Sequence, residues 1–196
     1  MNTLIFDLET TGLPLKNGKT YFKYDNLEKY NNSRVLSICW KIFNNNNKEI
    51  KSNYKIIKPT DFIIDNNSYA CKINNITKEL ADEKGIDIKL MFNELKQDLI
   101  DTNVIVAHNL DFDYNILLSE LYRYNRLDII NLLQTKDKYC TMMNGIQITK
   151  IPMKNSYKFP KLIELYRHFF NTDFEDAHNA EADVSACSKC YFKMVN

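Results

Sequence analysis

The chain has 196 residues, of which 44% are apolar and 12% are aromatic, so it can bury one substantial core and is short for two independent domains. We therefore expect a single domain over residues 1–196. Its 26 basic and 25 acidic residues leave a net charge of +1, which excludes the strongly basic class of proteins that coat nucleic acid. A nucleic-acid partner would have to be held by local features of the surface.

No apolar run reaches the roughly 18 residues of a membrane-spanning helix, and the N-terminal segment lacks the pattern of a secretion signal. We expect an intracellular protein, cytoplasmic or nuclear, without membrane contact. The five cysteines have no regular spacing and do not suggest a disulfide framework. Cys187 and Cys190 form a C-x-x-C within a helical pattern, but no second pair of ligands accompanies them, so core packing is favoured over a zinc site.

The first half of the chain predicts strands. Residues 3–8 form a β-rich apolar run that ends at acidic residues and a Thr-Thr-Gly turn, which indicates a strand leading into a loop. The polar residues 14–33 predict a long surface excursion. Residues 35–43 and 50–58 predict two further strands, joined by a turn at the asparagine run, so that three strands form a meander.

The second half predicts helices around one more strand. From residue 77 onward, apolar residues recur at the spacing of an amphipathic core helix. They are Ile88, Met91, Phe92, Leu95 and Leu99. Residues 103–107 predict a buried strand, and a helical pattern begins directly after it. Helices are also expected over residues 129–133, 161–170 and 179–194. This order fits a mixed sheet flanked by helices.

The first candidate site is Asp7 and Glu9, which are separated by one residue on a predicted strand and therefore point to the same face. Two neighbouring carboxylates repel each other unless a cation binds them, and hard oxygen ligands suit Mg²⁺ or Mn²⁺. An exposed D-x-E is often solvated surface. Here Phe6 and Leu8 flank the acidic residues, which predicts that the other face of the strand is buried.

Two later segments add further polar groups. Asp111 and Asp113 lie where a strand gives way to a helix. A helix cap at Asp111 and a first-turn position favoured by the helix dipole at Asp113 explain them as well as function does. His178 and Asp183 are five residues apart at the start of the last predicted helix. A lone histidine is more often structural than catalytic, so this segment alone decides nothing.

Taken together, the three segments resemble the DEDDh exonucleases, the family of the proofreading subunit of DNA polymerase III. The family's first motif, FDLETTGL, is present at residues 6–13. The second, H-N-x-x-F-D, is matched by His108, Asn109, Phe112 and Asp113, and the third, a histidine followed five residues later by aspartate, by His178 and Asp183. Order and intervals agree, and the similarity spans nearly the whole chain. The resemblance implies a ribonuclease H-like α/β fold, in which helices flank a mixed five-stranded sheet.

The resemblance also implies a 3′-to-5′ exonuclease that uses two Mg²⁺ or Mn²⁺ ions about 3.5–4 Å apart, with the scissile phosphate between them. Asp7, Glu9, Asp113 and Asp183 would be the metal ligands. His178 would be the general base, since an ordinary histidine pKa of about 6.5 suits proton transfer near neutrality. Asp111 is not expected to be a ligand.

The same motifs imply how the 3′ end is recognised. The backbone at Thr10 and Thr11 would approach the terminal hydroxyl, and Leu13 and Phe112 would wedge against or stack on the last bases. Ordinary core packing explains Phe112 equally well. Asn109 would hold its loop or contact the strand.

The chain departs from the family at residues 74–77, where Asn-Asn-Ile-Thr replaces the frequent H-G-[IL]-[TS] pattern. Asparagine can donate a hydrogen bond and adopt a left-handed backbone, so we expect the turn to persist. The expected substrate is the 3′ end of single-stranded or frayed DNA, with a DNA polymerase as a candidate partner. An exoribonuclease and an inactive nucleic-acid-binding module are the alternatives, although no ligand of the motif is lost.

Overall fold

The computed structural model describes residues 2–175 and 179–195, and a five-stranded sheet with the order β5-β4-β1-β6-β7 lies at its centre. The strands are β1 (Asn2–Thr10), β4 (Val35–Phe43), β5 (Glu49–Ile56), β6 (Thr102–Ala107) and β7 (Asp137–Cys140). β1 pairs with β4 in antiparallel and with β6 in parallel orientation, and β6 pairs with β7 in parallel. The expected mixed sheet, including the meander β1-β4-β5, is confirmed.

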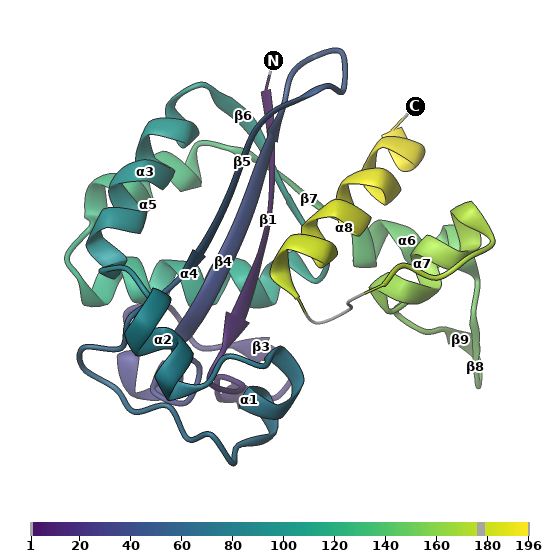
Figure 1. The fold of residues 1–196 in the computed structure, drawn as a ribbon. Coiled ribbons are helices and arrows are strands. Elements are labelled where there is room, and N and C mark those ends of the chain that lie inside the picture. The colour runs from purple at the N-terminus through teal and green to yellow at the C-terminus, as the bar shows by residue number, and fades with distance from the viewer. Residues whose placement is uncertain (1, 176–178, 196) are drawn as a thin grey trace.

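Helices cover both faces of this sheet (Figure 1). Helices α3 (Ile88–Ile100), α4 (Leu110–Arg123) and α5 (Leu127–Gln134) pack on one face, and α8 (Ala180–Val195) packs on the other. Alternation along β1 decides what each face receives. Phe6 and Leu8 join the large core beneath α3 and α4, whereas Ile5 packs with Val184 of α8. Asp7 and Glu9 follow Ile5 at two-residue steps, so β1 presents them on the side of α8.

Two parts of the chain differ from the expectation. The helical pattern from residue 77 onward is two helices, α2 (Lys78–Lys84) and α3, because the chain between them turns against another strand end. A Cβ on Gly85 would lie 2.7 Å from the backbone nitrogen of Lys58, and Asp87 caps α3 by accepting the Lys89 N–H. Residues 14–33 are more than a surface excursion, since they form a small hairpin and a 3₁₀ helix that buries Tyr30.

That hairpin consists of β2 (Lys16–Asn17) and β3 (Thr20–Tyr21), and the 3₁₀ helix covers Leu27–Tyr30. Besides β7, three further elements lie where the sequence pattern indicated none. They are α1 (Tyr69–Asn74), α6 (Thr141–Thr149) and the hairpin of β8 (Pro152–Met153) and β9 (Ser156–Tyr157). The expected helix near residues 161–170 is α7 (Leu162–Phe170), which packs against α8.

Cys187 and Cys190 are buried on α8, in the cores beneath β1 and α7 respectively, which confirms the packing interpretation of this pair. All five cysteines are free thiols. Among the residues that the structure describes, no helix has the length and apolar character needed to cross a membrane.

Candidate active site

Three of the four predicted metal ligands meet where β1 passes under the start of α8. One oxygen from each of Asp7, Glu9 and Asp183 can be chosen so that all lie within 4.8 Å of one another. The acidic residues of β1 share a face because they are two residues apart, and Asp183 lies in the first turn of α8 on the side that packs against this strand. Residues 176 positions apart in the chain therefore form one cluster.

Asp113, the fourth predicted ligand, lies beside this group in the first turn of α4 and is 2% exposed. Its Oδ1 accepts the backbone N–H of Leu8 at 3.2 Å. The parallel pairing of β1 with β6 ends at Ile5, so Leu8 has no strand partner on that side and the carboxylate serves instead. Asp113 is thus a first-turn residue, as the alternative interpretation expected, and its carboxylate also bonds to β1, which carries Asp7 and Glu9. Asp111 points elsewhere, accepting a bond from the Asn115 amide.

Without a bound cation, the carboxyl groups of this cluster ionise less readily than ordinary ones. Burial, and then the charges of Asp113, Asp183 and Glu9, raise the pKa of Asp7 well above its usual range. Burial and the charge of Asp183 raise the pKa of Glu9 to about 8. Clustered carboxylates with raised pKa values are a cost that a bound divalent cation removes, and an all-oxygen donor set suits Mg²⁺ or Mn²⁺. The residues present therefore fit the expected metal.

The loop after Glu9 is held rigidly from one side. The Thr11 N–H donates to the carbonyl of Arg34 at 2.9 Å, and the Arg34 N–H donates to the Thr11 hydroxyl at 2.9 Å. A Cβ on Gly12 would lie 2.8 Å from the carbonyl oxygen of Asn32, so the close passage of the two backbones needs glycine. The Arg34 side chain is itself buried, with its Nε 2.5 Å from a carboxylate oxygen of Glu120.

A cavity of about 420 Å³ opens beside Glu9 and this loop. Four of the five residues predicted to bind substrate line it, namely Thr10, Thr11, Leu13 and Phe112. Leu13 is 75% exposed, which costs free energy unless a ligand covers it. Phe112 lines the cavity and also touches the main core, so the structure supports both interpretations of this ring.

Helix α1 forms another wall of the cavity. This helix was not predicted from the sequence. Tyr69, Ile73 and Asn74 contribute from this helix. The Asn74 amide donates to the carbonyl of Thr10 at 3.4 Å and hydrogen-bonds the carboxylate of Glu9. Asn75 ends α1 with a positive φ of 57°, so the turn persists despite the departure from the family pattern. The signal that could have revealed this helix is the Asn74-Asn75 pair, which forms its end.

Asn109 holds its loop through its backbone. Its φ of 67° is left-handed, a conformation that asparagine tolerates, and its carbonyl accepts the Phe112 N–H as α4 begins. Its side chain lines two hollows next to the cavity. His178, the predicted general base, lies outside the described residues, and its role stays a prediction.

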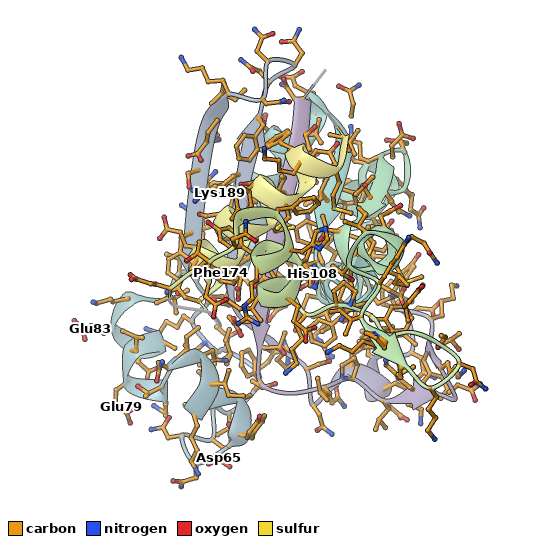
Figure 2. All side chains as sticks on the ribbon, turned by 90° about the vertical axis from the view of Figure 1, so that its right-hand side faces the viewer. Asp65, Glu79, Glu83, His108, Phe174 and Lys189 are labelled. Carbon is orange, nitrogen blue, oxygen red and sulfur yellow. The ribbon has the colours of Figure 1, made fainter. Side chains whose placement is uncertain are left out.

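His108, the histidine of the second motif, is fixed on both ring nitrogens. Nε2 lies 3.0 Å from the carbonyl of Pro160 and Nδ1 lies 2.9 Å from the hydroxyl of Thr141. A carbonyl only accepts, so Nε2 carries the proton and Nδ1 accepts from Thr141 in the neutral ring. Figure 2 shows His108 within the body of the molecule, whereas Glu79 and Glu83 project from α2 at the rim. The ring therefore connects the second motif to α6 and to the segment before α7.

This environment makes stability depend on pH. Burial lowers the pKa of His108 to about 4, so between pH 6.5 and 4 the unfolded chain binds a proton that the folded chain does not bind. Above about pH 6.5 the neutral ring does not reduce the free energy of unfolding. As the pH drops through this window, the free energy of unfolding falls by about 3 kcal/mol. We expect His108→Gln to lower the slope of unfolding free energy against pH by about 1.4 kcal/mol per unit there.

Urea unfolding at pH values from 4.5 to 7 measures this slope. Thr141→Val is the matched control, because it removes the hydroxyl partner but keeps the buried ring. It should lower stability at every pH and leave the slope close to that of the unsubstituted chain. Equal slopes for the unsubstituted protein and His108→Gln would contradict the assignment.

Comparison with known proteins agrees with this arrangement. The RNase T family model, described as exonuclease, matches residues 4–191. DNA polymerase III PolC-type from Mycoplasma genitalium is 28% identical over 193 residues, which is 96% of this chain and 11% of that protein. Escherichia coli exonuclease I in complex with a dT13 oligonucleotide aligns with a TM-score of 0.71 and 18% identity, over 97% of this chain and 40% of that one. The zinc-bound form of its complex with single-stranded DNA gives 0.70 and 17%, over 99% and 40%.

The fold is of the ribonuclease H-like α/β type, and the carboxylate cluster at the edge of its sheet is suited to hold a divalent cation. The chain belongs to the RNase T exonuclease family, as the match over residues 4–191 shows, and the family expected from the three motifs is confirmed. The chain spans only 11% and 40% of the lengths of these relatives. The expectation of a single domain over residues 1–196 stays a prediction.

Proposed function

We propose that this chain removes nucleotides from the 3′ end of single-stranded or frayed DNA by hydrolysing the terminal phosphodiester bond. The observation that carries the proposal is the convergence of Asp7, Glu9 and Asp183, with buried Asp113 beside them, next to a cavity of about 420 Å³ that Glu9 lines. We propose DNA and not RNA as the substrate because the solved structures with similar folds include complexes of exonuclease I with DNA.

The four carboxylates would hold one or two Mg²⁺ or Mn²⁺ ions. When bound, such an ion neutralises charge on the phosphate and makes a coordinated water more acidic. Groups of the chain itself would position the 3′ end and accept the proton. The loop pinned by Arg34 would place the backbone of Thr10 and Thr11 against the terminal 3′-hydroxyl, while Leu13 and Phe112 would enclose the terminal base. His178 would accept the proton of the attacking water.

The test uses DNA and RNA oligonucleotides of the same sequence, each labelled at the 5′ end. We expect Mg²⁺-dependent shortening of the DNA from its 3′ end, no reaction in excess EDTA, and resistance of a strand that ends in a 3′-phosphate. Cleavage of a circular strand at the same rate would show an endonuclease instead. Faster degradation of the RNA would favour the exoribonuclease alternative.

We also propose a DNA polymerase as the protein that supplies these ends. Its support is the similarity to the PolC-type polymerase, of which this chain matches a minor part. Co-purification of a polymerase with the tagged chain from its own cells is the corresponding measurement. Recovery of the chain alone would favour a freestanding enzyme.

A further inference from the structure

Two more hollows continue the cavity beside Glu9. The first, of about 610 Å³, lies across Leu13 and Phe112, which line both it and the cavity. The second, of about 600 Å³, shares Lys16, Tyr21 and Asn109 with the first. Because each hollow shares lining residues with the next, the three lie next to one another on the surface. We call the two hollows beyond Leu13 and Phe112 the strand groove.

Segments far apart in the sequence build the strand groove. Lys16, Lys19 and Tyr21 come from the β2-β3 hairpin, Lys138 from β7, and Phe159 from the segment after β9. Figure 1 shows β3 and the β8-β9 hairpin toward the end of the molecule to which the carboxyl end of β1 points. The groove therefore starts at the catalytic edge of the sheet and leads away from it.

At two places in this groove a lysine lies over an aromatic ring. The Nζ of Lys16 lies 4.2 Å from the centre of the Tyr21 ring, and the Nζ of Lys138 lies 4.1 Å from the centre of the Tyr114 ring. Lys16, Lys19 and Lys138 are all exposed. Among the residues that line the groove, Asp111 is the acidic one, and its carboxylate is engaged by Asn115. The groove thus carries local positive charge on a chain whose net charge is only +1.

Tyr114 gives an independent indication of a ligand. Its side chain lines the groove, the residue is only 9% exposed, and its hydroxyl is buried without a hydrogen-bond partner in the described part of the chain. A buried hydroxyl without a partner costs free energy, and most such groups in proteins are satisfied. Phe159, at the same end of the groove, is 53% exposed. An apolar ring and an unsatisfied hydroxyl that line the same hollow suit a ligand with flat apolar faces and polar groups.

We propose that the strand groove binds the single-stranded nucleotides that precede the 3′-terminal one. The three lysines contact their phosphates, Tyr21 and Phe159 stack on their bases, and the Tyr114 hydroxyl bonds to the strand. The proposal rests on the proposed function, because it takes the cavity beside Glu9 as the position of the terminal nucleotide. It adds the path of the strand and residues for which the three sequence motifs give no role.

Binding tests the groove without requiring catalysis. The probe is a 5′-labelled oligothymidylate about ten nucleotides long, titrated in EDTA at several salt concentrations and followed by fluorescence anisotropy. Each phosphate contact on a single strand contributes about 0.7 to the slope of log affinity against log salt. The variant Lys16→Gln/Lys19→Gln/Lys138→Gln should reduce that slope by about 2 and weaken binding about 10- to 100-fold near 0.1 M salt. Lys48→Gln/Lys84→Gln/Lys193→Gln, outside the groove, is the matched control and should bind normally.

Hydrolysis separates the groove from the terminal site. The p-nitrophenyl ester of thymidine 5′-monophosphate has no preceding nucleotide and reaches only the cavity. Its rate of cleavage in Mg²⁺ should therefore be the same in the groove variant and the unsubstituted chain, while KM for the longer strand rises in the variant. Tyr114→Phe, which removes one hydroxyl, should weaken binding of the longer strand about 2- to 10-fold. An unchanged salt slope in the groove variant, or equal loss on both substrates, would overturn the proposal. Absence of hydrolysis with intact groove binding would instead reject the proposed function.

Discussion

Asp7→Asn should lower the rate of exonucleolytic cleavage by at least about 10³-fold and at the same time stabilise the metal-free protein. The loss follows because a catalytic cation contributes several kcal/mol of charge stabilisation, and each 1.4 kcal/mol is a factor of ten in rate. The gain follows from the cluster that Asp7 forms with Glu9 and Asp183. An amide of the same shape removes one of three mutually repelling carboxylates.

The sign of the stability effect follows from the raised pKa of Asp7. Above the ordinary pKa of an aspartate, the unfolded chain releases a proton that the folded metal-free chain retains, so stability falls as the pH rises toward the folded-state value. Asp7→Asn has no carboxyl group at this position, so its stability does not fall for this reason as the pH rises. In EDTA at pH 7.5 the variant should therefore melt at a higher temperature than the unsubstituted protein.

Adding Mg²⁺ should reverse that order. An ion that binds only the folded state raises stability with concentration, so the unsubstituted protein should gain and Asp7→Asn should gain little. Glu181→Gln, an exposed substitution two residues before Asp183, should retain both activity and the Mg²⁺ response. A lower melting temperature for Asp7→Asn in EDTA, or an equal Mg²⁺ response in both proteins, would count against a metal site at this cluster.

The sequence predicted those parts of the fold whose pattern is strong over many residues. β1 and β4 alternate or bury nearly every residue, and α3 repeats its apolar side chains over three turns. β7 (Asp137–Cys140) is an edge strand with no buried residue, and α1 (Tyr69–Asn74) buries only Cys71, so neither leaves a periodic signal. The fifth strand was expected only because the family resemblance implied it.

Some features of the candidate site follow from local sequence patterns, and others depend on how distant segments pack together. Asp7 and Glu9 could be placed on one face from their two-residue spacing alone, but their meeting with Asp183 required the packing of α8 on β1. The contact of Asn74 with Thr10 joins residues 64 apart and depends on a helix that the sequence did not reveal. The contact of Lys138 with the Tyr114 ring forms only when β7 and α4 come together in the fold. The composition of the chain does not indicate such contacts.

His178→Ala should lower the cleavage rate by about 10²–10⁴-fold, the usual effect of removing a general base. His178 is adjacent in sequence to Asn179, whose Oδ1 accepts the Glu181 N–H and whose carbonyl accepts the Asp183 N–H at the start of α8. Neither of these bonds involves the histidine side chain. Helix α8 and Asp183 should therefore keep their places in the variant.

Three measurements distinguish a base from a packing residue at this position. The rise in melting temperature on adding Mg²⁺ should survive in His178→Ala, because the carboxylates remain, and the far-ultraviolet circular dichroism should be unchanged. The decline of activity below about pH 6.5, which a histidine base imposes, should disappear from the residual rate. His168→Ala, which removes an exposed ring from α7, should cleave at the normal rate. Full activity of His178→Ala at neutral pH would remove the base from the mechanism and leave the carboxylate cluster as the catalytic centre.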